Sequence, residues 1–321
     1  MNEYGNFIRR ADLIKNLIER EKLAEETKKP SRATKDANQK RWEQHQNNLR
    51  QELSAAIAAS VAVGGNVPPS LLFANAERGV WFDASDITTL FQDPAGTIPV
   101  TATGQPVGKW LDKSGNNNHA TQNTSGSRPT YQVDQYGYPY LDFDGVNDFM
   151  ITPSINFTTT DKLQASVGLL THNSASAGTA GIAIELGTDV NAVNGSFYIS
   201  APSNTADHGF ALRGTTTIAA RVNNIVSGDD VLTGLFDISQ SAKEAELIAR
   251  LARQTAASAS ISWTGTSAGT GNFGNLPLYI GARAGTLFLF KGHMYQIVVR
   301  GAESTAVQLV QIENWINSKL Q

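Results

Sequence analysis

From Leu71 to about residue 301, the chain is a series of short stretches that alternate apolar and polar residues, separated by clusters of Gly, Asn, Ser and Asp. A period of two places successive side chains on opposite faces of a strand, and such turn clusters are typical of antiparallel sheets. Many short strands without intervening long helices predict a two-sheet antiparallel sandwich rather than βαβ units. The expected strands span residues 79–84, 140–145, 148–153, 164–171, 182–187, 196–201, 209–214, 216–222, 230–239, 259–265, 277–283 and 293–301.

Two later segments carry helical signals. Segment 241–257 (SAKEAELIARLARQTAA) has high helix propensity but lies between two expected strands. We expect a strand over about 246–254 there, because pairing with neighbouring strands can override propensity. Behind Ser304, a plausible N-cap, apolar residues recur at helical spacing. This spacing predicts a C-terminal helix over 304–319, with Trp315 buried against the sandwich.

The first 65 residues are rich in Glu, Lys, Arg, Gln and Ala, unlike the rest of the chain. Apolar spacing predicts helices over 6–26 and 36–63, and Gly64–Gly65 ends the second. Neither helix can bury its apolar stripe alone, and isolated helices of this length are marginally stable in water. We therefore divide the chain into a helical attachment segment (1–65), a linker (66–71) and a sandwich (72–321). The residues expected to dock on partners are Phe7, Ile14, Leu17, Ile18, Trp42, Leu49 and Leu53.

Charge and composition exclude several classes of protein. Residues 1–65 hold 12 Lys and Arg against 9 Asp and Glu, and the other 256 residues hold 14 against 20, so a weakly basic arm precedes an acidic body. The acidic sandwich gives nucleic-acid binding little support. The absence of cysteine excludes disulfides and thiolate metal sites. We find no signal peptide and no apolar stretch long enough to span a membrane.

Four stretches, in order, resemble the phage and bacterial branch of the concanavalin A-like (laminin-G-like) family. They are GVWFDASD (79–86), VGKWLDKSGNNNHATQ (107–122), RPTYQ…YLDFDGVNDFM (128–150) and LYIGARAG…ENWINSK (278–319). The resemblance implies a jelly roll of two facing antiparallel sheets. Asp112 with Asn116, and Asp144 with Asn147, lie where Asx side chains close loops onto backbone N–H groups.

The sequence lacks the residues that glycan hydrolysis requires. Glucanases of this fold bring paired carboxylates together from alternate positions of one strand, and no E-x-D-x-x-E pattern occurs here. The Gly-rich segment 269–274 precedes an expected strand instead of opening a helix, so we interpret it as a turn. The five histidines show no metal-ligand spacing. We therefore expect no enzymatic activity and no cofactor.

Two binding sites remain as hypotheses. Asp144, Asn147 and Asp148 could supply oxygen ligands for Ca²⁺ from one loop, although we favour the explanation that Asp144 and Asn147 brace a turn and that no metal is bound. Exposed aromatic residues beside polar groups are the usual features of a sugar site. The candidate residues for a glycan are Tyr136, Tyr138, Tyr140 and His208.

The resemblance and the helical N-terminus together indicate a structural virion protein of a tailed bacteriophage, such as a tail fibre, collar or head decoration. It would assemble in the host cytoplasm as a homo-oligomer, with residues 1–65 docked on other virion proteins and the sandwich displayed outward. The alternative is a carbohydrate-binding module that contacts host surface glycans. Because fold does not imply function, the choice depends on the site.

Overall fold

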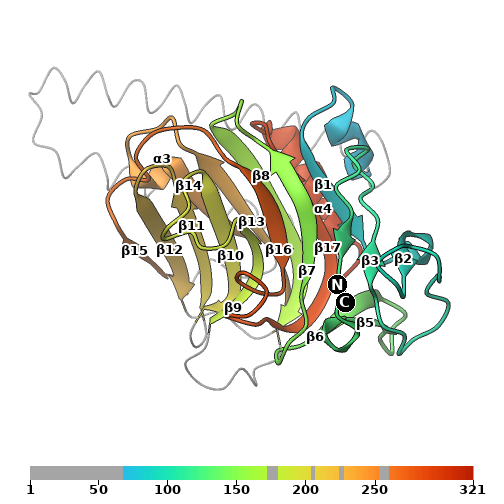
Figure 1. The fold of residues 1–321 in the computed structure, drawn as a ribbon. Coiled ribbons are helices and arrows are strands. Elements are labelled where there is room, and N and C mark those ends of the chain that lie inside the picture. The colour runs from blue at the N-terminus through green and yellow to red at the C-terminus, as the bar shows by residue number, and fades with distance from the viewer. Residues whose placement is uncertain (1–67, 172–179, 204–206, 224–227, 253–259, 321) are drawn as a thin grey trace, which may run out of the picture.

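The computed structural model describes residues 68–171, 180–203, 207–223, 228–252 and 260–320. These residues form two antiparallel sheets packed face to face (Figure 1), which confirms the expected jelly-roll-like sandwich. The attachment segment, with Phe7, Ile14, Leu17, Ile18, Trp42, Leu49 and Leu53, lies outside the described residues. Among the described residues, no helix is long and apolar enough to cross a membrane.

The first sheet has seven strands in the order β14-β13-β8-β17-β6-β5, and β1 also pairs with β17. The register of β1 and β17 places Trp81 opposite Val298, so the first and last strands of the sandwich lie side by side. The strands are β1 (Gly79–Asp83), β5 (Thr130–Val133), β6 (Pro139–Asp144), β8 (Lys162–Thr171), β13 (Asp229–Asp237), β14 (Leu247–Leu251) and β17 (Lys291–Arg300).

The second sheet has ten strands in the order β15-β12-β11-β10-β9-β16-β7-β4-β3-β2. Its longer strands coincide with the stretches expected from alternation, while β2, β3 and β4 have only two residues each. The strands are β2 (Leu90–Phe91), β3 (Lys109–Trp110), β4 (Ala120–Thr121), β7 (Met150–Asn156), β9 (Ala180–Leu186), β10 (Ser196–Ser203), β11 (His208–Arg213), β12 (Thr217–Asn223), β15 (Ser260–Thr264) and β16 (Asn275–Ile280).

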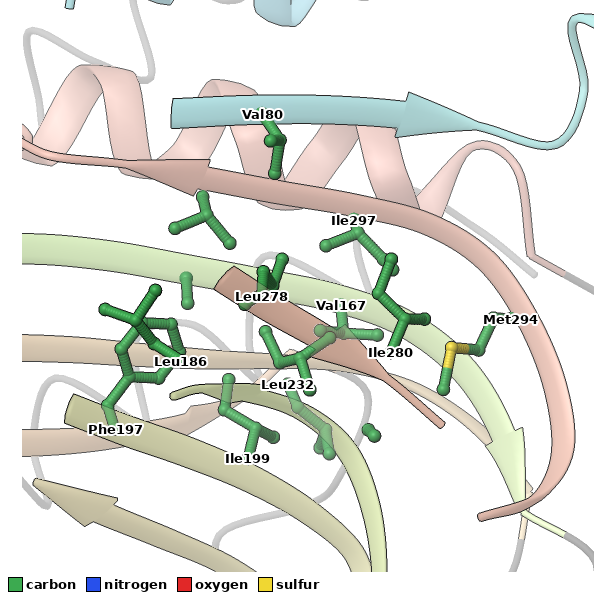
Figure 2. Close-up of a cluster of buried hydrophobic side chains, with 14 of the residues drawn as sticks. Val80, Val167, Leu186, Phe197, Ile199, Leu232, Leu278, Ile280, Met294 and Ile297 are labelled. Atoms are coloured by element: carbon green, nitrogen blue, oxygen red, sulfur yellow. The ribbon is translucent and has the colours of Figure 1, made fainter. Parts of the chain in front are cut away.

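One apolar core fills the space between the sheets (Figure 2). Val167 of β8 and Ile297 of β17 extend from the seven-stranded sheet, and Phe197 and Leu278 extend from the ten-stranded sheet. Burial of apolar area contributes about 25 cal/mol per Å², which makes this core the main source of stability.

The ambiguous segment 241–257 forms a strand, as expected, over a shorter range. A single helical turn, α3 (Lys243–Glu246), precedes β14. β14 pairs with β13 and buries Leu247 and Leu251 in the core. This pairing and burial override the helix propensity of the segment, whose residues 253–257 lie outside the described residues.

The expected C-terminal helix over 304–319 is confirmed over a shorter range, α4 (Ala306–Asn317). Its N-cap is Thr305 rather than Ser304, because the Thr305 hydroxyl accepts a hydrogen bond from the Gln308 backbone N–H at 3.2 Å. The Gln308 side chain accepts one in return from the Thr305 backbone N–H at 3.0 Å, which completes a capping box.

α4 packs on the outer face of the seven-stranded sheet and forms a second apolar cluster there. Ile312 and Ile316 are fully buried, and Ile316 occupies the space over Gly168, where a Cβ atom would come within 2.4 Å of its Cγ2. Trp315 was expected to be buried, but it is only half-buried. Its ring meets the ring of Trp81 edge-on, with 6.2 Å between centroids.

Three 3-10 helices complete the described elements: η1 (Pro69–Phe73), η2 (Ile87–Thr89) and η3 (Ser125–Ser127). η1 buries Leu72 and Phe73 in the second apolar cluster, and the Leu72 carbonyl accepts a hydrogen bond from Arg300 Nε at 2.9 Å. Pro69 of η1 is also buried, so part of the expected 66–71 linker packs on the sandwich.

The loop that follows β3 is closed by a buried carboxylate, as the Asx pattern predicts. Asp112 accepts hydrogen bonds from the backbone N–H of Trp81 at 2.9 Å and of Asn118 at 3.0 Å. Asn116 acts differently from the expectation, because its amide donates to the Glu77 carbonyl at 2.9 Å. These bonds connect the loop to β1 and to the residues just before it. The polar residues Asp112 and Asn116 of the stretch 107–122 therefore stabilise the fold.

Candidate functional site

The Ca²⁺ candidates form a hydrogen-bonded turn between β6 and β7. Asp144 Oδ1 accepts hydrogen bonds from the backbone N–H of Val146 at 2.7 Å, of Asn147 at 3.2 Å and of Asp148 at 3.4 Å. Asp148 Oδ2 accepts one from the Asp144 backbone N–H at 3.1 Å. Burial, with the charges of Asp144 and Asp142, raises the pKa of Asp148 to about 6. Within the described residues, no group of three or more His, Asp or Glu could hold a metal ion.

The tyrosine candidates lie on the β5–β6 hairpin at one edge of the seven-stranded sheet. Tyr136 is 68% exposed at the turn. Tyr138 and Tyr140 are half-buried against the second apolar cluster, and the Tyr140 ring stacks on His293 with 3.7 Å between centroids. Only Tyr136 of the three has the exposure that we expected of a glycan contact.

His208 lies apart from these tyrosines, in the ten-stranded sheet. It shares the core-facing side of β11 with Phe210 and Leu212, and it is 4% exposed. Burial lowers the pKa of His208 to about 3, so the imidazole is neutral. The structure therefore does not bring the four glycan candidates together.

The outer face of the ten-stranded sheet brings together residues that sequence reasoning did not select. Tyr198 of β10 lies between Phe197 and Ile199, which are buried in the core, so its side chain points to the outer face. The same alternation places Arg213 of β11 and Arg221 of β12 on this face. Both described α-helices contact strands of the seven-stranded sheet, and α4 lies behind that sheet (Figure 1).

Strand register arranges the outer-face residues in a row across the sheet. Tyr279 pairs with Glu185, Glu185 with Tyr198, Tyr198 with Ala211, and Ala211 with Ala219. Directly paired positions have Cβ atoms about 5 Å apart. Tyr198 therefore has an acidic neighbour on one side and small side chains on the other.

A buried ion pair lies beside Tyr198. Arg283 Nε donates to Glu185 Oε2 at 2.9 Å, and Arg283 Nη1 lies 3.2 Å from Asp189 Oδ1. The Val190 backbone N–H donates to Glu185 Oε1 at 2.8 Å. Burial raises the pKa of Glu185, although the hydrogen bond and charge of Arg283 oppose the shift. Glu185 is fully buried and its carboxylate is fully engaged.

Aromatic rings flank this ion pair. The Arg283 guanidinium lies 5.6 Å from the centroid of the Tyr198 ring and 4.9 Å from that of Phe288. Such distances allow cation–π attraction. Phe288 is 42% exposed, and its backbone adopts φ 50°, a left-handed conformation that is uncommon for a bulky residue. Phe288 and Tyr198 thus both lie within cation–π range of one guanidinium.

The other two arginines of the face have different partners. Arg221 Nη1 lies 3.8 Å from Asp207 Oδ2, and the Arg221 side chain is 42% exposed. Arg213 Nε donates to Asn194 Oδ1, and its Nη1 donates to Thr217 Oγ1, both at 2.9 Å. The charge of Arg221 is thus near a carboxylate, whereas these contacts of Arg213 are to neutral oxygens.

Sequence reasoning missed this group because its members come from several strands and from the loops that follow them. One signal was available in the stretch SFYISA (196–201), where Tyr198 occupies the polar phase of an otherwise clear alternation. An aromatic residue in that phase points away from the core. Which outer face remains free of α4 depends on the tertiary structure.

Comparisons with known proteins give only distant similarities. No family model and no curated protein matches the chain. A carbohydrate-binding module, CBM40, of Ruminococcus gnavus IT-sialidase bound to alpha2,3 sialyllactose has a TM-score of 0.33 and 15% identity, covering 48% of this chain and 83% of that chain. The binding domain of botulinum neurotoxin serotype G has a TM-score of 0.45 and 11% identity, covering 74% and 51%.

An arabinofuranosidase complexed with arabinofuranosyl-alpha-1,2-xylobiose has a TM-score of 0.34 and 16% identity, covering 67% of this chain and 51% of that chain. This chain therefore spans about half the length of the toxin and arabinofuranosidase chains. TM-scores below 0.5 carry no argument about function. The assignment to the β-sandwich class rests on the strand pairing and the buried core.

Proposed function

We propose that the sandwich is a non-enzymatic glycan-binding module whose binding surface is the outer face of the ten-stranded sheet. The observation that carries the proposal is the position of Tyr198, a half-buried aromatic residue in the middle of that face, paired in register with Glu185 and Ala211. Ligand sites combine apolar and aromatic surface with a few oriented polar groups. Tyr198 supplies the first, and polar groups beside it, such as the Arg283 guanidinium 5.6 Å from its ring centroid, supply the second.

The carboxylates of this face support binding rather than hydrolysis. Retaining and inverting glycosidases need two carboxyl groups that flank the scissile bond. Here Glu185 and Asp189 both pair with Arg283, and Glu185 is fully buried. A carboxylate engaged in this way is a poor nucleophile or general acid, so the proposed module binds sugar without cleaving it.

Replacement of Tyr198 tests the glycan proposal. The full chain is first applied to a glycan array, and affinity for the bound glycan is then measured by calorimetry. We expect Tyr198→Ala to weaken binding about tenfold, which corresponds to about 1.4 kcal/mol. Tyr136→Ala is the matched control, because Tyr136 is 68% exposed on a hairpin of the other sheet, and it should bind as the wild type does. Absence of any bound glycan, or equal effects of the two variants, would reject the proposal.

We further propose that residues 1–65 attach the sandwich to a tailed-phage particle, where the chain is a structural virion protein and forms a homo-oligomer. The support comes from the sequence: the segment is net basic while the rest of the chain is net acidic, and its two apolar stripes need a partner surface. Display of a glycan-binding face on a particle fits both proposals.

Deletion of residues 1–65 tests the attachment proposal. The shortened chain should keep the sandwich folded, because the apolar core lies within residues 80–299, but it should no longer enter particles. Thermal unfolding reports on the fold, and particle composition reports on incorporation. Normal incorporation of the shortened chain would show that the segment is not an anchor.

A further inference from the structure

We propose that the glycan bound on the outer face carries a carboxylate, and that Arg213 binds this group. The inference rests on the proposed function and specifies its ligand class. It predicts that this module prefers acidic saccharides to neutral ones, although residues 66–321 have more Asp and Glu than Lys and Arg. Because long-range attraction to an acidic ligand is then weak, local contacts must provide the preference.

The position of Arg213 is set by neutral neighbours. Its Nε donates to the Asn194 amide oxygen and its Nη1 to the Thr217 hydroxyl, both at 2.9 Å. The Thr217 hydroxyl donates in turn to the Val190 carbonyl at 3.2 Å. The side chain is therefore held in place by oxygens that do not neutralise its charge.

The other arginines of this face differ in that respect. Arg283 pairs with Glu185 and Asp189 at 2.9 and 3.2 Å. Arg221 has Asp207 at 3.8 Å. A ligand carboxylate at either of these arginines would lie close to a protein carboxylate, and like charges at such distances repel. Arg213 is the member of the three whose described hydrogen bonds leave a full positive charge for a ligand.

The remaining hydrogen-bond donors of Arg213 suit a carboxylate. A guanidinium has five N–H donors, and the two bonds described above use the Nε–H and one Nη1–H. The Nη1–Nη2 edge therefore keeps donors that match the two oxygens of a carboxylate, a pairing stronger than a neutral hydrogen bond.

The distance from Tyr198 suits a single ligand. Tyr198 pairs with Ala211, two residues before Arg213 on β11, so the two positions are separated along the strand by about 7 Å. One sugar ring packed against Tyr198 can carry a carboxylate over that distance. Ala219, the next outward position of the row after the buried Ala211, is half-buried and has a small side chain.

The test compares carboxylated, sulfated and neutral glycans on an array, and then titrates the best carboxylated glycan and its carboxyl-reduced form by calorimetry. We expect carboxylated glycans to bind, and reduction of the carboxylate to weaken binding about tenfold. Arg213→Gln should cause the same loss for the carboxylated glycan and no loss for the reduced form. Added salt should weaken the binding of the carboxylated glycan to the wild type and should not weaken the binding of the carboxyl-reduced glycan.

The matched control is Arg221→Gln, which removes the same charge from the same face. Its effect on the carboxylated glycan should be less than about threefold, since Asp207 already offsets its charge. Asn194→Ala removes one of the hydrogen bonds that position Arg213 but keeps the Arg213 charge. Thermal unfolding of each variant shows whether a loss of binding comes from the site or from loss of structure.

The outcomes separate this inference from the proposed function. Binding of neutral glycans only, or an Arg213→Gln variant that binds the carboxylated glycan like the wild type, overturns the inference and leaves the glycan proposal standing. Binding of sulfated but not carboxylated glycans shows that the anion class is wrong. Binding of no glycan overturns both.

Discussion

Glu313→Ala is expected to lower the free energy of unfolding by about 3–5 kcal/mol, because removal of one partner leaves the other buried and charged. Arg250 of β14 donates to both Glu313 oxygens, through Nε at 2.9 Å and Nη2 at 3.0 Å. The Arg250 side chain is 10% exposed and that of Glu313 is 2% exposed. Although burial alone would lower the pKa of Arg250, the charge and hydrogen bonds of Glu313 raise it.

Urea unfolding of three variants measures this effect. Glu244→Ala is the control. The Glu244 side chain is 36% exposed and forms a long ion pair with Lys243, with 3.8 Å between the charged atoms. Exposed pairs of this kind contribute about 0–1 kcal/mol to stability. The double variant Arg250→Met with Glu313→Leu should recover most of the loss, since apolar pairs of similar volume replace buried ion pairs well. A loss below about 1 kcal/mol for Glu313→Ala would mean that α4 is not held by this pair.

The free energy of unfolding is also expected to decrease as the pH is lowered, because of His208. Burial lowers the pKa of its imidazole to about 3 in the folded chain, whereas an unfolded imidazole has a pKa of about 6.5. Between these two values the unfolded chain binds more protons. The free energy of unfolding therefore decreases as the pH falls from 6.5 toward 3, by up to about 1.4 kcal/mol per pH unit.

Comparison of the wild type with His208→Leu isolates this contribution. On going from pH 7.5 to 4.5, the wild type should lose roughly 2–3 kcal/mol more than the variant. Asp148 acts in the opposite direction, because its raised pKa of about 6 makes the folded chain bind a proton first as the pH falls. Both proteins contain Asp148, so its effect cancels. Equal losses in the two proteins would show that His208 is solvated in the folded state.

The sequence by itself determined most of the longer strands and their inward faces, because alternation is a local property, whereas β5 and the two-residue strands β2, β3 and β4 were not expected. β12 is an example, in which the burial of Thr217–Asn223 alternates at every residue. Turn chemistry was equally local: Asp112 and Asp144 accept backbone N–H bonds within their own loops, as their spacing indicates. The C-terminal helix followed from its spacing, although its N-cap shifted to Thr305.

Local patterns did not identify the buried groups that hold distant segments together. Arg250 and Glu313 are 63 residues apart, and no spacing rule relates them. His208 was expected at a glycan site as a loop residue, but it belongs to β11, and its place in the alternation of that strand buries it. Trp315 was expected to be the anchor of α4, but Ile312 and Ile316 are fully buried whereas Trp315 is half-buried.

Only the tertiary structure decided which sheet face α4 covers. The stretch that contains Tyr198 indicates an outward side chain, but it does not indicate whether α4 packs over β10 or over the other sheet. That choice depends on the free energy of the whole assembly: Gly168 provides space for Ile316, and Arg250 provides a partner for Glu313. Pairing of the consecutive strands β10 and β11 then places Tyr198 and Arg213 on one face, and Arg283, which follows β16 much later in the chain, lies beside Tyr198.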